Sequence, residues 1–225
     1  MRSDDAIVCD VPRRVIASAA DVAEGMRALA ARDPAWTPLI ERTGVPPLRR
    51  WPGGFEGLAS IVVSQQVSVA SARAIWERTR AVLGEVSVAR LLSASDDDLR
   101  RCGLSRPKQR ALRAAASAAA GGRLDFDALE RAEADAVHDM LTAIAGIGPW
   151  TADIYILMCL GHRDGFAAGD LAVQEAARHA FGLPARPGAR ELLARAEAWR
   201  PWRGVAAHLL WAYYAVLKGR EGIVS

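Results

Sequence analysis

The chain has 225 residues, 51% of them apolar, and a formal net charge of +3. This length suits one sizeable domain or two small lobes around a shared cleft, and the apolar fraction suffices for a packed core. No apolar run reaches the ~20 residues that a membrane helix needs, which argues against a membrane span. The small net charge does not by itself indicate nucleic acid. All cations except two lysines are arginine, which suits phosphate but also follows from a coding bias.

The first residues, Met1 to Asp5, lack the charged-then-apolar pattern of a signal peptide, so we expect a cytoplasmic protein. Three cysteines, Cys9, Cys102 and Cys159, lie far apart in the sequence. No pair has metal-ligand spacing, and a structural disulfide is not expected in this compartment. We therefore predict no metal site.

Helix signals dominate the chain and convincing period-2 strands are absent, which predicts an all-α fold. Ser18 with Asp21 and Ser95 with Asp98 match helix-capping patterns. Three prolines and three glycines predict a loop over 42–54. In chain order, helices are predicted over 18–31, 55–83 with a break near 65–67, 87–92, 95–101, 105–120, 135–145, 149–160, 171–181, 189–198 and 204–218.

The most informative segment is L-T-A-I-A-G-I-G-P-W-T-A at residues 141–152. It reads as a helix, a tight turn at Gly146-Ile147-Gly148, and a second helix that Pro149 opens. Glycine allows a sharp turn because it adopts positive φ, and Ile147 can anchor the turn in the core. Free amides at the helix start, with the helix dipole, can bind a phosphate without reading bases. An ordinary helix–helix turn is the alternative.

This string, with P-W-T-A directly after the turn, resembles the helix-hairpin-helix of the DNA glycosylase superfamily of that name, in particular the DNA-3-methyladenine glycosylase II branch. The resemblance covers about residues 18–218 and implies two helical lobes with the substrate cleft between them. Residues 54–163 would form the central lobe with the hairpin, and 1–53 with 164–225 would form the other. The branch's founding members carry an N-terminal β-rich domain, which the short N-terminal segment implies is missing or reduced. Some relatives hold an iron–sulfur cluster on four C-terminal cysteines, a cluster that this chain cannot form.

Asp170 follows the hairpin by twenty-two residues and precedes a helical pattern. On its own it reads as a helix N-cap. The resemblance implies that it is the one essential aspartate, facing C1′ of the sugar. A fixed carboxylate there stabilises positive charge on the sugar and can orient or deprotonate the attacking water. Asp153 and Asp164 are weaker rivals for this role.

Bifunctional relatives form a Schiff base with a lysine at the position of Trp150, and this chain has none there. The resemblance with this substitution predicts base removal without strand cleavage. Electron-rich rings attract a cationic base by stacking and cation–π interaction. The expected pocket residues are Trp150, Trp211, Trp202 and Tyr155. The pocket is thinner in aromatic residues than in the founding members, because Ile154 and Ala212 stand at two of their aromatic positions.

The segment Ser64-Gln65-Gln66-Val67-Ser68 resembles the family's motif at a helix junction. A base that leaves the stack needs something to fill its place, so we expect Gln66 or Val67 to enter the duplex, with Gln65 beside them. A polar helix cap is the alternative.

A second basic helix start follows Gly103, with Ser105 as its cap and Arg106 and Lys108 within reach of phosphate. A solvated charged face explains it equally well. From the hairpin we also expect DNA contacts through Gly146, Ile147, Gly148 and Thr151.

The sequence thus predicts a monofunctional DNA glycosylase that removes alkylated purines of the 3-methyladenine and 7-methylguanine type from double-stranded DNA with a flipped damaged base. The alternatives are a non-catalytic binder of DNA structure and a glycosylase for neutral lesions such as hypoxanthine or etheno-adenine. We expect no organic cofactor, no membrane partner, and a monomer associated with the nucleoid. The resemblance to the superfamily implies a monovalent cation (Na⁺ or K⁺) held by carbonyls of the hairpin.

Overall fold

The computed structural model describes residues 15–219. Its elements are α1 (Ala19–Arg32), α2 (Trp36–Thr43), α3 (Gly54–Ser64), α4 (Val69–Leu83), α5 (Val88–Ser93), α6 (Asp96–Arg101), α7 (Arg106–Ala120), α8 (Phe126–Arg131), α9 (Ala134–Thr142), α10 (Pro149–Ile154), the π-helical segment η1 (Tyr155–Leu160), α11 (Leu171–Ala180), α12 (Ala189–Ala196), the 3-10 turn η2 (Glu197–Trp199) and α13 (Arg203–Leu217). Within this range the one β-type pairing is a single bridge between Val15 and His162, so the predicted all-α fold is confirmed. Of the helices in the described range, none has the length and apolar character to cross a membrane.

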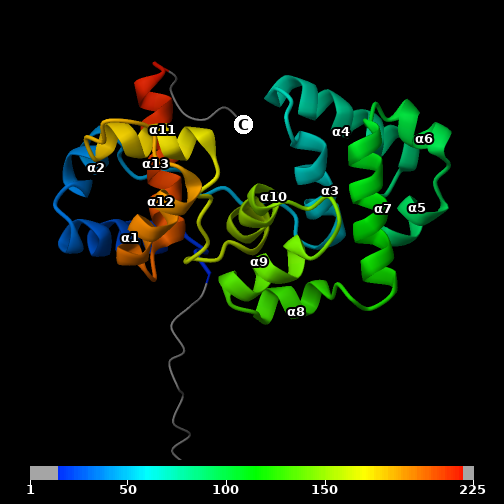
Figure 1. The fold of residues 1–225 in the computed structure, drawn as a ribbon, viewed down its shortest axis with the longest axis horizontal. Helices are drawn as coiled ribbons and strands as arrows, with labels where there is room; N and C mark the ends of the chain where they lie inside the picture. The colour runs from blue at the N-terminus through cyan, green and yellow to red at the C-terminus, as the bar shows by residue number, and fades with distance from the viewer. Residues whose placement is uncertain (1–14, 220–225) are drawn as a thin grey trace, which may run out of the picture.

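The helices pack in two groups that lie next to each other in Figure 1. The central group runs from α3 to η1, and in it α3 packs against α4, α7, α8 and α10. The terminal group holds α1, α2, α11, α12 and α13, with α13 packed against α1, α2 and α11. The chain passes between the groups along 44–53 and again along 161–170. The exact domain boundaries stay a prediction.

Every predicted helix that begins after residue 15 is present, with boundaries within three residues of the expected ones. Both capping boxes, Ser18 with Asp21 and Ser95 with Asp98, are formed. Helices α2 and α8 were not expected; α2 begins without a side-chain cap, whereas Asp125 caps α8. The predictions on the start of the chain and on Cys9 lie outside the described residues.

Candidate active site and nucleic-acid interface

Asp170 is the N-cap residue of α11. Its Oδ1 accepts hydrogen bonds from the backbone N–H groups of Ala172 (2.9 Å) and Val173 (3.1 Å). The carboxylate is therefore held at the positive end of the α11 dipole, as the capping pattern predicts. Capping does not exhaust its hydrogen-bonding capacity, because Oδ2 takes no part in it.

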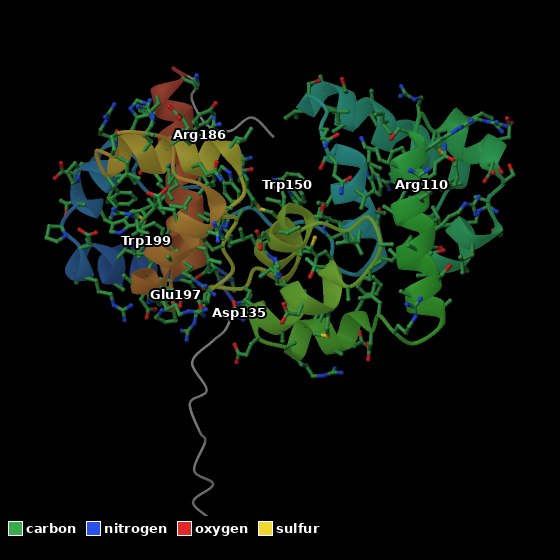
Figure 2. All side chains as sticks on the ribbon, in the orientation of Figure 1. Arg110, Asp135, Trp150, Arg186, Glu197 and Trp199 are labelled. Atoms are coloured by element: carbon green, nitrogen blue, oxygen red, sulfur yellow. The ribbon has the colours of Figure 1, made fainter. Side chains whose placement is uncertain are left out.

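Two tryptophans complete the hydrogen bonding of Asp170, one from each group of helices. Trp150 of α10 donates its indole N–H to Oδ2 (3.0 Å), and Trp211 of α13 donates to Oδ1 (3.1 Å). Figure 2 shows Trp150 at the junction of the two groups. Four N–H donors thus converge on a side chain that only accepts, which is the pattern of an ionised carboxylate. Trp211 is buried and Trp150 is partly exposed.

The segment before Asp170 is anchored, so the carboxylate has little freedom to move. Gln174 donates its side-chain amide to the carbonyl of Ala168 (2.8 Å). The Phe166 ring packs edge-on against Trp199 with centroids 5.5 Å apart. These contacts fix the loop against the core of the terminal group.

The hairpin turn has the expected shape, although its two glycines differ. Gly146 has φ +87°, and a Cβ there would lie 2.6 Å from the Cβ of Ala111. Ile147 is 3% exposed, which confirms it as the anchor of the turn. Gly148 has an ordinary φ of −89°, and a Cβ there would meet nothing within 4 Å. Only Gly146 therefore needs glycine for the fold, whereas the space beside Gly148 is open to a ligand.

The second helix of the hairpin starts without a side-chain cap. Gly148 is the N-cap residue of α10 and Pro149 is the first helical residue. The first amides of this helix are not bonded by any cap side chain. An uncapped start with open space beside it suits an external anion.

The turn between α3 and α4 carries the two candidates for the wedge. Among the described residues other than glycine, Gln66 alone has a positive φ (+55°), and it is exposed. Val67 is 38% exposed. Gln65 instead donates its side-chain amide to the hydroxyl of Thr151 (2.8 Å), and Thr151 is 1% exposed. The buried Thr151 hydroxyl is not available to DNA, and its bond with Gln65 ties this turn to α10. DNA contacts by Gln65 and by the Thr151 backbone stay a prediction.

The structure corrects two of the predicted pocket residues. Tyr155 has no exposed surface, and its hydroxyl accepts the backbone N–H of Gly54 (3.0 Å). Burial raises the pKa of Tyr155 far above its ordinary value. Trp202 lies just before α13, nine residues or ~13 Å of helical rise from Trp211. The Arg163 guanidinium covers its ring, and the ring packs beside Gly25 of α1. Neither side chain lies against Asp170.

Lys108 does not face solvent, contrary to its predicted role on phosphate. It is 8% exposed, and its ammonium donates to the carbonyl of Val63 (2.7 Å) at the end of α3. Burial lowers the pKa of Lys108. Ser105 is exposed and its hydroxyl makes no capping bond, so at this helix start Ser105 and Arg106 are the groups that a phosphate can reach.

The two rival aspartates have other surroundings. Asp164 is paired with Arg200 and Arg203. Asp153 lies in α10 with its side chain 13% exposed, and burial raises its pKa to about 7 against the smaller opposing charge of Arg203. Its Oδ1 is 3.7 Å from Nε2 of His138. Neither carboxylate contacts the two indoles.

His208 is a neighbour of the site that the sequence analysis missed. It lies one turn before Trp211 on α13, with the two rings edge-to-face and 5.8 Å apart. Burial, with a smaller contribution from the charge of Arg49, lowers the pKa of His208 to about 4. The imidazole is thus neutral at physiological pH. The one sequence signal for His208 is its position three residues before Trp211, which on a helix places the two side chains on the same face.

Other candidate sites do not overlap with Asp170. A cavity of about 220 Å³ is lined by Val15, Arg50, Glu130, Cys159, Leu160 and His162, none of which touches the two indoles. Within residues 15–219 no group of three histidine, cysteine or acidic side chains is placed to hold a metal ion.

Comparison with known proteins identifies the class to which this geometry belongs. Residues 59–201 match the model of the HhH-GPD superfamily of base excision DNA repair proteins, and the chain belongs to this family. The match spans the hairpin, Trp150 and Asp170, and it ends just before α13, the helix that carries Trp211.

Particular relatives narrow the class. DNA-3-methyladenine glycosylase 1 of Schizosaccharomyces pombe is 30% identical over 161 residues, which cover 70% of this chain and 71% of that protein. A DNA-3-methyladenine glycosidase from Bacillus halodurans has a similar structure (TM-score 0.78, 34% identity, 87% of this chain and 91% of that chain). The S. pombe enzyme Mag1 in complex with abasic DNA is also similar (TM-score 0.76, 26% identity, 87% and 97% covered).

Proposed function

We propose that this protein is a monofunctional DNA glycosylase that removes alkylated purines from double-stranded DNA in base excision repair. The observation that carries the proposal is the Asp170 carboxylate, held by four N–H donors at the junction of the two helix groups. The names of the relatives, which are 3-methyladenine glycosylases, support the substrate class.

The proposed reaction is hydrolysis of the bond between C1′ and the base nitrogen. A 3- or 7-alkylated purine is cationic, so it takes the bonding electron pair and leaves as a neutral base. The sugar gains positive charge in the transition state, and the fixed Asp170 carboxylate stabilises that charge. Water then adds to C1′ and gives its proton to Asp170 or solvent, which leaves an abasic sugar.

Trp150 and Trp211 have two parts in this scheme. Their N–H groups hold the carboxylate in one orientation. The partly exposed Trp150 ring offers a π-face on which a cationic base can stack. The absence of lysine at position 150 supports base removal without a Schiff base or strand cleavage.

The proposed DNA contacts follow from the two turns of the central group. The uncapped start of α10 at Gly148 would bind a phosphate near the lesion. Gln66 or Val67 would occupy the space that the flipped base leaves. We propose a single copy of the chain per lesion.

The carbonyl oxygens of the hairpin turn are suitable ligands for a monovalent cation. The carbonyl oxygens of Ala145, Gly146 and Ile147 accept none of the loop and turn hydrogen bonds formed by the described residues. They are the groups that would hold Na⁺ or K⁺, whose charge would add to the attraction for a phosphate.

Two other functions remain to be distinguished by experiment. A non-catalytic binder of DNA structure would use the hairpin alone. A glycosylase for hypoxanthine or etheno-adenine would use the same carboxylate on a neutral base.

The test is to incubate the wild-type protein with methylated duplex DNA and to separate the released purines by chromatography. We expect free 3-methyladenine or 7-methylguanine, with strands that break only after alkali. Duplexes with hypoxanthine or etheno-adenine test the neutral-lesion alternative in parallel. Duplex binding with no base released from any of these substrates would contradict the proposal and favour the structural binder.

A further inference from the structure

A closed cluster of two arginines and three carboxylates lies where the two helix groups meet, outside the Asp170 site. We call it the Arg–carboxylate cluster; its members are Asp135, Asp164, Glu197, Arg200 and Arg203. Figure 2 shows two of them, Asp135 and Glu197, on the same side of the molecule and well apart from Trp150. Nothing in the proposed reaction uses these five side chains.

Each carboxylate of the cluster bridges the two guanidinium groups. Asp135 places Oδ1 on Arg203 (3.1 Å) and Oδ2 on Arg200 (2.8 Å). Glu197 places Oε1 on Arg203 (2.9 Å) and Oε2 on Arg200 (2.8 Å). Asp164 places Oδ1 on Arg203 (3.1 Å) and Oδ2 on Arg200. All six carboxylate oxygens are thus paired, and the geometry of the planar guanidinium fork sets their positions.

Burial within the cluster is uneven. The Arg203 side chain is 3% exposed, so its charge needs nearby carboxylates. The Asp135 side chain is 69% exposed. Burial raises the pKa of Asp135, but hydrogen bonds from Arg200 and Arg203 outweigh it and lower that pKa below its ordinary value. If Asp135 lost its carboxylate, two carboxylates would still balance two arginines, so Arg203 would not become an unpaired buried charge.

The cluster connects three segments of the chain, each of which leads to one of the three residues of the Asp170 site. Asp135 is its only member from the central group and lies on α9, which leads through the hairpin to Trp150. Asp164 precedes Asp170 by six residues on the segment between the groups. Arg203 begins α13, which carries Trp211 about 12 Å further along the helix.

We infer that Asp135 is a positioning residue. Through Arg200 and Arg203 it fixes α9 and the hairpin against the terminal group, so that the Trp150 indole reaches Asp170. This inference rests on the proposed function for its effect on the reaction. Its effect on geometry does not depend on that function.

The test compares Asp135→Ala with Asp139→Ala, both in the wild-type protein and together with Trp150→Phe. Asp139 is a matched control because it lies one turn further along α9, with its side chain 88% exposed and outside the cluster. Trp150→Phe removes the N–H that bonds Asp170, and it also assigns the Trp150 indole signal in a ¹⁵N–¹H NMR spectrum. Single-turnover base release and duplex affinity are measured for each variant.

We expect Asp135→Ala to shift or broaden the Trp150 indole signal and to slow base release about tenfold, with duplex affinity unchanged. In the Trp150→Phe background the same change should slow release less than about twofold, because the two changes act through one contact. Asp139→Ala should do neither. An unmoved Trp150 signal, or an equal rate loss in both backgrounds, would overturn the inference. If the wild type releases no base, the proposed function fails, and the NMR signal alone decides the role of Asp135.

Discussion

The starts of α10 and α11 are linked by the hydrogen bond from Trp150 to Asp170, and they are capped in different ways. The start of α11 holds an internal anion, because the Asp170 side chain occupies its first amides. The start of α10 has a glycine at the N-cap position and no side-chain cap. One start therefore fixes a charge of the protein itself, and the other is left for a charge from outside.

This difference divides the work between the two helix groups. In the proposed scheme the hairpin backbone of the central group binds the DNA, and the buried Ile147 side chain anchors the turn. In the proposed reaction the Asp170 carboxylate of the terminal group does the chemistry, and the surrounding N–H donors orient it. Changes in the hairpin should therefore affect folding or duplex affinity, whereas changes at Asp170 should affect the rate of base release.

The two hairpin glycines give the largest expected change in stability. Gly146→Ala forces a side chain into positive φ and into contact with Ala111, which should lower the free energy of unfolding by about 3–4 kcal/mol. Gly148→Ala meets no protein atom, so it should alter stability by less than about 0.5 kcal/mol and weaken duplex binding several-fold. Urea unfolding and a duplex titration measure the two effects. Equal losses of stability would show that Gly148 is also a requirement of the fold.

Asp153 contrasts with Asp170, since it is a buried carboxylate of the central group without an N-cap role. Its pKa of about 7 means that the native state keeps a proton that the unfolded chain loses near pH 4. Stability should therefore fall as pH rises from about 4 to 7, by on the order of 2–3 kcal/mol. Asp153→Asn should remove this part of the pH dependence.

Urea unfolding between pH 4.5 and 8 tests this, with exposed Asp139→Asn as the control. The difference in unfolding free energy between Asp153→Asn and the wild type should grow in favour of the variant as pH rises. A difference that stays constant across that range would show that Asp153 is ionised in the fold throughout.

Lys108 should show the smallest effect. Its replacement by methionine stabilises the fold by removing a buried charge and destabilises it by removing the hydrogen bond to Val63. These two effects largely offset each other, so the free energy of unfolding should change by about 1 kcal/mol or less. The salt dependence of duplex binding should not change. Arg106 lies on the exposed start of the same helix. If it contacts a phosphate, Arg106→Met should reduce the magnitude of the slope of log K against log [salt] by about 0.9. A lowered slope for Lys108→Met would restore its predicted place on DNA.

Much of the fold and the centre of the site could be predicted from the sequence because local rules govern them. The caps at Ser18, Ser95 and Asp170 and the Gly146 turn follow from a few adjacent residues. Of the six-residue helices α5, α6 and α8, only α8 was not predicted, although Asp125 caps it.

Contacts between distant residues could not be predicted in the same way. Lys108 and Thr151 looked like surface groups beside motifs, and only the packing of α7 and α10 on α3 buries them. Tyr155 and its neighbour Ile154, which stands at the expected pocket position, are both buried because α10 and η1 pack on α3. The Arg–carboxylate cluster joins residues up to sixty-eight positions apart and has no local signature.

The most direct test of the account is the single-turnover rate of base release for Asp170→Asn at saturating enzyme. Asp125→Asn is the matched control, because Asp125 caps α8 through the same two amide positions away from the indoles. We predict a loss of about 10³-fold or more for Asp170→Asn, with duplex affinity retained, and no loss for Asp125→Asn. An Asp170→Asn rate within about tenfold of the wild type, a factor worth only ~1.4 kcal/mol of barrier, would contradict the catalytic role of this carboxylate.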